Sequence, residues 1–271
     1  GAASAAYQVE GAWNEDGKGE SIWDRFSHTP GKINDGNTAD IACDHYHRFP
    51  TDIALLASLG FNAYRFSVEW ARIEPEEGEF SRAALEHFRR VLAACHEHGI
   101  TPIVTYHHFT SPRWLIRGGG WLDERTPDRF ARYCERVTAH LGDLIGVGCT
   151  LNETNIARVL SAVLPFDVQG GEWWGEAAQA FGVPTDRLGL FQFNGGEAAR
   201  TIIMASHRRG YEAIKAAGAN FPVGLTLAML DVQAGAGGER RAAEVQHSLN
   251  DCYLEQVRGD DSLTVTNGSR S

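Results

Sequence analysis

The chain has 271 residues and a formal net charge of −10, from 25 Lys and Arg against 35 Asp and Glu. With 43% hydrophobic and 10% aromatic residues it can bury one large core, and α/β barrels commonly run to about 250 residues as a single domain. The acidic balance argues against nucleic acid or an anionic membrane as the main partner, and no apolar run approaches the roughly 20 residues that span a bilayer.

Five cysteines are scattered along the chain, and no two form a C-x-x-C pair of the kind used for zinc or redox work. Three lie in apolar segments, which predicts small buried thiols and suits a reducing cytoplasm. Residues 1–6 are small and apolar but have neither a charged lead nor a long apolar core, so they do not resemble a signal peptide. We therefore expect a cytoplasmic protein.

Strands and helices alternate through the first half of the chain. A short N-terminal strand leads to residues 7–11, and a polar, Gly-rich loop with Trp13 and Trp23 continues through Gly36. Side chains suited to helix caps, glycines at helix ends and apolar periodicity define the elements that follow. They predict helices at 44–59, 82–98 and 126–144 and strands at 61–68, 100–106 and 145–149.

The second half opens with a long connection, residues 157–194, whose Trp173 and Trp174 and Gly and Pro breaks we interpret as a wall over a pocket. After it the pattern predicts helices at 197–217 and 240–257 and strands at 223–227 and 263–266. Regular alternation predicts a parallel sheet and favours an α/β barrel of the (β/α)₈ TIM type over an open sheet. Neither G-x-G-x-x-G after the first strand nor G-K-[ST] occurs, which argues against a nucleotide-binding fold.

The number of strands disagrees with a closed barrel, because about six of the eight βα units are present. An open sheet curved for a barrel would leave two exposed edges and an uncovered interior. We therefore expect residues 1–271 to form a single, partial TIM-barrel domain. Either partner chains complete it, which implies a homo-oligomer, or the sequence is a fragment.

Polar and aromatic side chains gather where the predicted strands end. In chain order they are Gln8, Arg65 (inside its strand), His108, Phe109, Asn152 and Glu153. Catalytic groups of α/β barrels occupy this face. Carboxamides, imidazole and aromatic faces suit a sugar, and a partly desolvated acid among them can hold a proton near neutral pH and pass it to a leaving oxygen.

Each of these residues also has a structural interpretation. Asn152 and Glu153 could simply mark a turn, Arg65 could be a surface charge, and a lone histidine such as His108 is more often a hydrogen-bonded core residue. The histidine pairs 45/47, 96/98 and 107/108 suggest a metal site instead, but no H-E-x-x-H motif or third ligand accompanies them. We expect no metal and no cofactor.

Three segments together resemble glycoside hydrolase family 1, the β-glucosidase family. They are residues 3–11 (ASAAYQVEG), 64–73 (YRFSVEWARI) and 150–155 (TLNETN), and the resemblance covers most of the chain in the family's order. It implies a (β/α)₈ barrel that hydrolyses β-glycosides with retention of configuration. The TLNETN segment is similar to the family's acid/base motif T-L/F-N-E-P-N, with Thr154 in place of proline.

The resemblance also implies residue roles. Glu153 would be the acid/base, Asn152 would bond the sugar 2-hydroxyl, and Arg65 would hold the nucleophile ionised. Gln8 and His108 match positions that bind the glycone, the sugar on the non-reducing side of the cleaved bond. Phe109 stands where the family usually has tryptophan.

The departures from the family concern the second carboxylate. The family's nucleophile is a glutamate in an I/V-T-E-N-G motif on strand seven, and the 271 residues contain no such motif. Residues 265–268 (VTNG) echo it without the glutamate, and their context places them on strand six. Retaining hydrolysis requires two carboxylates about 5–5.5 Å apart. The nearest spare carboxylates, Glu10, Glu69 and Glu74, have no supporting motif.

Three functional hypotheses follow. The first is a family 1 β-glucosidase-type hydrolase acting on a β-glucoside or related small saccharide, with activity of this chain in question because the nucleophile is absent. The second is a non-catalytic sugar-binding or interaction protein derived from that family. The third, a barrel glycosidase of another clan, is disfavoured by the first two motifs.

Overall fold

The computed structural model describes residues 1–164, 167, 169 and 171–258. Its centre is a parallel five-stranded sheet in the order β1-β2-β3-β4-β5, with every strand beside its neighbour in the chain. The strands are β1 (Ala2–Ala3), β2 (Ala63–Ser67), β3 (Thr101–His107), β4 (Val147–Leu151) and β5 (Val223–Gly224). The expected parallel, partly built barrel is confirmed for these strands, and the predicted strand at 263–266 lies outside the described residues.

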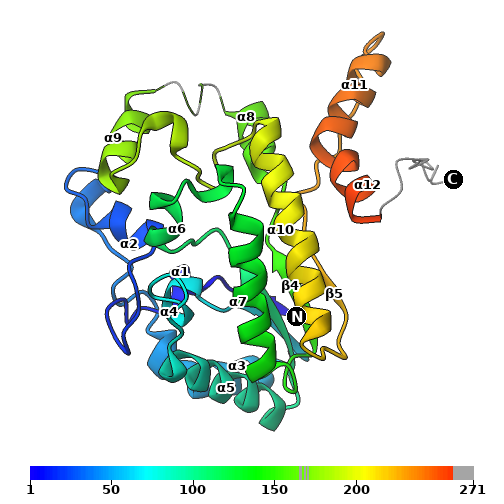
Figure 1. Cartoon of the computed structure of the whole chain (residues 1–271). Helices are drawn as coiled ribbons and strands as arrows, with labels where there is room; N and C mark the ends of the chain where they lie inside the picture. The colour runs from blue at the N-terminus through cyan, green and yellow to red at the C-terminus, as the bar shows by residue number, and fades with distance from the viewer. Residues whose placement is uncertain (165–166, 168, 170, 259–271) are drawn as a thin grey trace, which may run out of the picture.

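Helices cover the outer face of the sheet, as Figure 1 shows. The long ones are α3 (His45–Ser58), α5 (Arg82–Glu97), α7 (Thr126–Leu141) and α10 (Glu197–Ala216). The short ones are α1 (Ala6–Val9), α2 (Ile22–Ser27), α4 (Trp70–Ile73), α6 (Arg113–Arg117), α8 (Ile156–Val163), α9 (Glu172–Phe181), α11 (Glu239–Gln246) and α12 (Cys252–Arg258). Single turns are η1 (Asn34–Gly36), η2 (Gly120–Leu122), η3 (Thr185–Arg187) and the π-helical η4 (His247–Asp251).

Sheet register decides which side chains face the helices and which face the barrel interior. Arg65 lies level with Ile103 and binds Thr105 and Cys149, so these four point inward. The alternating residues, among them Phe66 and Val104, are buried in the main core against the helices. Ile103 keeps partial exposure on the inner side, because the five described strands enclose part of a barrel and leave β1 and β5 as edges.

Several predicted elements need correction. The loop expected up to Gly36 contains α2, which a reciprocal capping box between Ser21 and Asp24 stabilises. The connection at 157–194 contains α8 and α9, and the helix predicted at 240–257 is interrupted by η4. The strand predicted at 223–227 is shorter in the structure, where β5 ends at Gly224, although Thr226 still donates its backbone NH to the Leu151 carbonyl at the end of β4.

No helix in the described part of the chain is both long and apolar enough to cross a membrane.

Candidate active site

Asn152, directly after β4, and Arg65, in the middle of β2, meet inside the barrel. The Arg65 Nη2 donates to Asn152 Oδ1 at 2.6 Å, and its Nε donates to Thr105 Oγ1 at 2.9 Å. Asn152 is 2% exposed, and Thr226 also donates to its Oδ1, at 3.1 Å. Within the described chain Arg65 makes no ion pair with a carboxylate, and its side-chain hydrogen bonds go to neutral acceptors.

Glu153 follows Asn152 in a left-handed backbone conformation. Its φ is 49°, which is uncommon for a residue with a branched or long side chain and costs conformational energy that the surroundings must offset. The backbone NH donates to Thr226 Oγ1 at 3.0 Å, and Thr226 is fixed in turn by the Leu151 carbonyl. Glu153 is half-buried, and no hydrogen bond or ion pair joins its carboxyl to another described residue.

Two threonines therefore support the site, and sequence reasoning missed both of them. Thr105 is an inward-facing residue of β3, which the alternation of side chains along a strand could have indicated. Thr226 is a polar residue in an apolar strand-like run, and its contacts depend on a register that the sequence does not show.

His108 and Phe109 lie together at the end of β3. Phe109 also has a positive φ, 68°, and the centre of its ring lies 5.2 Å from the centre of the His108 imidazole. Burial, with a smaller contribution from the Arg65 charge, lowers the pKa of His108 to about 4, so the ring is neutral at pH 7. Its buried Nδ1 has no partner among the described residues. A neutral imidazole with an unused nitrogen can bind a sugar hydroxyl.

Gln8 stands apart from the other predicted site residues. It lies in α1, directly after β1, and its side chain is exposed. No hydrogen bond joins that side chain to another described residue. The structure thus brings Asn152 into direct contact with Arg65. Glu153 follows β4, and His108 and Phe109 follow the adjacent strand β3. Gln8, after β1, makes no side-chain hydrogen bond with any of them.

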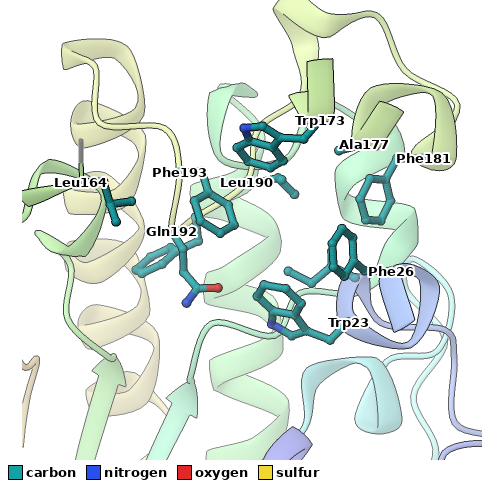
Figure 2. A pocket seen from close by; sticks show the side chains of 11 residues that line it. Trp23, Phe26, Leu164, Trp173, Ala177, Phe181, Leu190, Gln192 and Phe193 are labelled. Carbon is teal, nitrogen blue, oxygen red and sulfur yellow. The ribbon is translucent and has the colours of Figure 1, made fainter. Parts of the chain in front are cut away.

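A deep apolar cavity of about 340 Å³ opens beside this face of the sheet. Figure 2 shows rings from α2 and α9 and from the segment before α10 turned toward one another around it. Trp173 belongs to its wall, so the interpretation of residues 157–194 as a wall over a pocket is confirmed for this part of the segment.

Two of the spare carboxylates serve the structure. Glu10 is buried and pairs with Arg72. Glu74 is also buried and accepts hydrogen bonds from Trp70 Nε1 at 2.8 Å and from the Gly78 backbone at 2.7 Å. Neither carboxylate is free to serve as a nucleophile.

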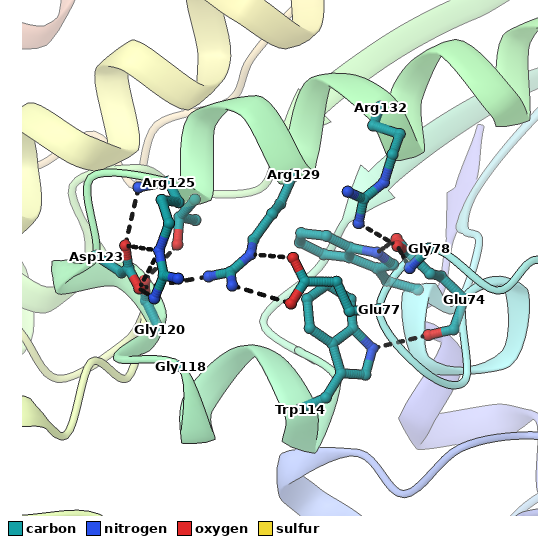
Figure 3. Close-up of polar contacts among 12 residues, drawn as sticks. Glu74, Glu77, Gly78, Trp114, Gly118, Gly120, Asp123, Arg125, Arg129 and Arg132 are labelled. Carbon is teal, nitrogen blue, oxygen red and sulfur yellow. Dashed lines mark hydrogen bonds and ion pairs between the residues drawn. The ribbon is translucent and has the colours of Figure 1, made fainter.

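Figure 3 shows how Glu74 takes part in a polar network that joins the segment after β2 to α7. Arg132 donates to Glu74, and Arg129 binds both oxygens of Glu77, at 2.7 and 2.9 Å. Trp114 Nε1 donates to the Glu74 carbonyl at 2.9 Å. The network therefore ties residues 74–78 to α6 and α7.

Glu69, the third spare carboxylate, is buried just after β2 and forms no ion pair with a described residue. Its Oε1 accepts the Ala71 backbone NH at 3.1 Å, and burial raises its pKa to about 8, although the Lys18 charge opposes that shift. The carboxyl is therefore protonated in the folded protein at neutral pH, and a protonated acid is a poor nucleophile.

Glutamine at position 69 is expected to remove a pH-dependent loss of stability. The folded pKa of Glu69, about 8, exceeds its ordinary value of 4.5, so the folded state holds a proton that the unfolded state releases. The contribution of the Glu69 carboxyl to the free energy of unfolding is fully present below pH 4.5 and is lost as the pH rises to about 8. Relative to wild type, Glu69→Gln should gain on the order of a few kcal/mol between these limits in urea unfolding. Glu79→Gln, at an exposed position on the following loop, is the control. If the difference in stability between Glu69→Gln and wild type does not change with pH over this range, Glu69 does not have the raised pKa.

Comparison with known proteins identifies relatives of the chain. Residues 1–171 match glycosyl hydrolase family 1. Beta-glucosidase A of Acetivibrio thermocellus is 46% identical over 171 residues, which are 63% of this chain and 38% of that protein. Lactase/phlorizin hydrolase of Rattus norvegicus is 46% identical over 267 residues, 98% of this chain and 11% of that protein.

The fold is shared with solved structures of the same kind. The crystal structure of beta-glycosidase BGL167 superposes with a TM-score of 0.86 at 51% identity, covering 96% of this chain and 62% of that one. The chain thus spans less than two thirds of the length of these relatives, and its five-stranded sheet is an incomplete (β/α)₈ barrel. The family match covers more than half of the 271 residues, and the chain belongs to glycosyl hydrolase family 1.

Proposed function

We propose that this chain carries the acid/base half of a retaining β-glucosidase site and binds the glycone of a β-glucoside. The observation that carries the proposal is the Asn152–Arg65 contact beside Glu153, in which a carboxamide and a carboxyl that follow β4 lie near a cation from β2. Relatives of the chain are β-glucosidases and a β-glycosidase.

Each group has a role in this proposal. Glu153 protonates the glycosidic oxygen as the bond to the anomeric carbon breaks, and then takes a proton from the attacking water. Asn152 presents its amide NH₂ to a sugar hydroxyl, because its carbonyl oxygen already accepts from Arg65 and Thr226. Arg65 keeps a second carboxylate ionised when one is supplied from outside these 271 residues.

A second candidate is binding of sugar without turnover. It is favoured by the partners of Arg65, which are Asn152, Thr105 and Cys149 and include no carboxylate. The glycone contacts of this candidate are the same as those of the first.

Asparagine 152 provides the test of glycone binding. Titration calorimetry with methyl β-D-glucopyranoside should show binding to wild type and a loss of about 10-fold or more in Asn152→Ala, the size expected for a hydrogen bond beside a charged group. Asn62→Ala, exposed at the opposite end of β2, is the matched control. Equal affinity of wild type and Asn152→Ala would refute the proposed site. Assay of the same samples with 4-nitrophenyl β-D-glucopyranoside separates the candidates, since binding without turnover supports the second.

A further inference from the structure

The last residue of the TLNETN segment, Asn155, has no role in the proposed function, yet its side chain is completely buried. It stands at the N-cap of α8, where an asparagine side chain usually accepts a hydrogen bond from the first turn of the helix. Asn155 makes no such bond. Its carboxamide binds the segment that follows β5 instead, so helix capping does not explain this residue.

The Asn155 carboxamide binds both backbone groups of one residue, Ala228. Its Oδ1 accepts from the Ala228 NH at 2.8 Å, and its Nδ2 donates to the Ala228 carbonyl at 2.9 Å. Nδ2 also donates to the Leu249 carbonyl of η4 at 2.8 Å. All three bonds require the same orientation of the amide, because Oδ1 only accepts and Nδ2 only donates. One side chain thus satisfies residue 228 as a neighbouring strand would in a ladder.

Thr226 forms a second connection between the same two segments. Its hydroxyl accepts from the Glu153 NH at 3.0 Å and donates to Asn152 Oδ1 at 3.1 Å. Its carbonyl accepts from the Thr154 NH at 3.2 Å. Residues 152–155 are therefore held against residues 226–228 at both ends of the turn. We call these contacts of Asn155 and Thr226 the Asn155–Thr226 clamp.

The clamp encloses the residue with the unfavourable backbone conformation. Glu153 has a φ of 49° and lies between the residues that the clamp holds. A left-handed backbone at a residue other than glycine persists only where the surrounding structure imposes it. No hydrogen bond or ion pair joins the Glu153 carboxyl to another described residue, so the backbone determines where that carboxyl lies. Loosening the clamp would let the backbone relax and move the carboxyl.

We propose that Asn155 and Thr226 are positioning residues for the acid/base, and that their clamp keeps the Glu153 carboxyl where it can give a proton to the glycosidic oxygen. The inference rests on the proposed function, because it takes Glu153 as that acid/base. Asn155 is 0% exposed and touches no substrate. Its removal should therefore weaken interactions that need the Glu153 proton and spare those that need only the glycone.

A second asparagine provides a matched control. Asn250 is equally buried and binds Leu230 in the same way, with Nδ2 donating to the Leu230 carbonyl at 2.8 Å and Oδ1 accepting from its NH at 3.2 Å. Nδ2 also donates to Gln246 Oε1 at 3.0 Å. Asn155→Ala and Asn250→Ala thus remove the same kinds of hydrogen bond from equally buried positions, and both should destabilise the fold. Only the first should disturb Glu153.

Two ligands report the position of the Glu153 carboxyl without requiring turnover. Methyl β-D-glucopyranoside offers the glycone alone. Glucoimidazole, a glucose-shaped bicyclic imidazole, has a basic nitrogen where the glycosidic oxygen would lie, and it binds most tightly when an acid protonates that nitrogen. In calorimetry with the full chain, wild type should prefer glucoimidazole by about 10-fold or more, and Glu153→Gln should remove most of this preference.

The asparagine variants separate positioning from stability. Asn155→Ala should remove most of the preference for glucoimidazole while its affinity for the methyl glucoside stays within about twofold of wild type, since small displacements of a catalytic group have large effects. Asn250→Ala should keep the preference. Thr226→Val retains the shape of threonine and should also lose the preference, together with affinity for the methyl glucoside through Asn152. Thr226→Ser, which keeps the hydroxyl, should restore both.

Hydrogen exchange of the backbone follows the clamp itself. The amides of Glu153 and Thr154 donate to Thr226 and should exchange slowly in wild type. Exchange at both amides should be faster by about 10-fold or more in Asn155→Ala and unchanged in Asn250→Ala. Unchanged exchange in Asn155→Ala would refute the clamp whether or not a ligand binds.

The two proposals fail in different ways. If Glu153→Gln keeps the preference for glucoimidazole, or if wild type binds neither ligand, the proposed function is refuted. If Glu153→Gln loses the preference but Asn155→Ala keeps it, the positioning role is refuted. Equal loss in Asn155→Ala and Asn250→Ala would also refute it, because the effect would then follow stability. If Asn155→Ala does not fold, Thr226→Val and Thr226→Ser decide, and equal preferences in these two variants would overturn the proposal.

Discussion

Replacing Glu153 by glutamine is expected to lower the turnover of phenyl β-D-glucopyranoside by a factor of about 10²–10⁴ when azide is present as an external nucleophile. Azide attacks the anomeric carbon while the bond to the phenolic oxygen breaks, and Glu153 gives its proton to that oxygen. The products are phenol and the α-glucosyl azide. Glutamine is similar in shape but has no proton to give, so phenolate, a basic leaving group, must depart unassisted.

The leaving group supplies the control. With 2,4-dinitrophenyl β-D-glucopyranoside the departing phenolate is a weak base that needs no proton, so Glu153→Gln should change its rate by much less. Chromatography of the products and initial rates for both substrates measure the effect. Equal losses for the two substrates would mean that Glu153 acts in folding or binding. Unchanged turnover of the phenyl glucoside would remove Glu153 from the mechanism.

The main helices and inner strands were predictable because their signals are local. Amphipathic stripes with caps and closing glycines predicted α5, α7 and α10, and the structure has them at Arg82–Glu97, Thr126–Leu141 and Glu197–Ala216. The short α2 was missed because it lies in a Gly-rich stretch, although Ser21 and Asp24 have the spacing of a capping box. The end of β5 at Gly224 depends on its pairing with β4, which is a tertiary effect.

The candidate site was predictable in its composition and only partly in its contacts. Strand ends of one parallel sheet meet at one edge, so Arg65, His108 and Asn152 could be grouped from the order of elements alone. The direct Arg65–Asn152 bond joins residues 87 positions apart and depends on strand tilt, which no sequence pattern reports. The positive φ of Glu153 and of Phe109 was equally hidden, because neither residue type signals a left-handed backbone.

Methionine at position 72 is expected to destabilise the fold by about 3–5 kcal/mol, the usual loss when one member of a buried ion pair is removed. Arg72 is 0% exposed and donates to Glu10 Oε2 at 3.2 Å and to the Gly11 and Ala12 carbonyls at 3.2 and 3.1 Å. Its guanidinium carbon also lies 4.1 Å from the centre of the Tyr46 ring. Methionine has a similar length but leaves a buried carboxylate and two carbonyls without donors. Urea unfolding at neutral pH measures the difference.

The control variant is Arg82→Met, whose side chain is 89% exposed and which should stay within about 0.5 kcal/mol of wild type. Adding Glu10→Gln to Arg72→Met should recover part of the loss, since the buried charge is then removed. A loss of less than 1 kcal/mol in Arg72→Met would contradict the role given to this pair. Because the Arg72 contacts hold residues 11 and 12, just after Gln8, against α4, the same variant should also weaken binding of methyl β-D-glucopyranoside if Gln8 contributes to the glycone site.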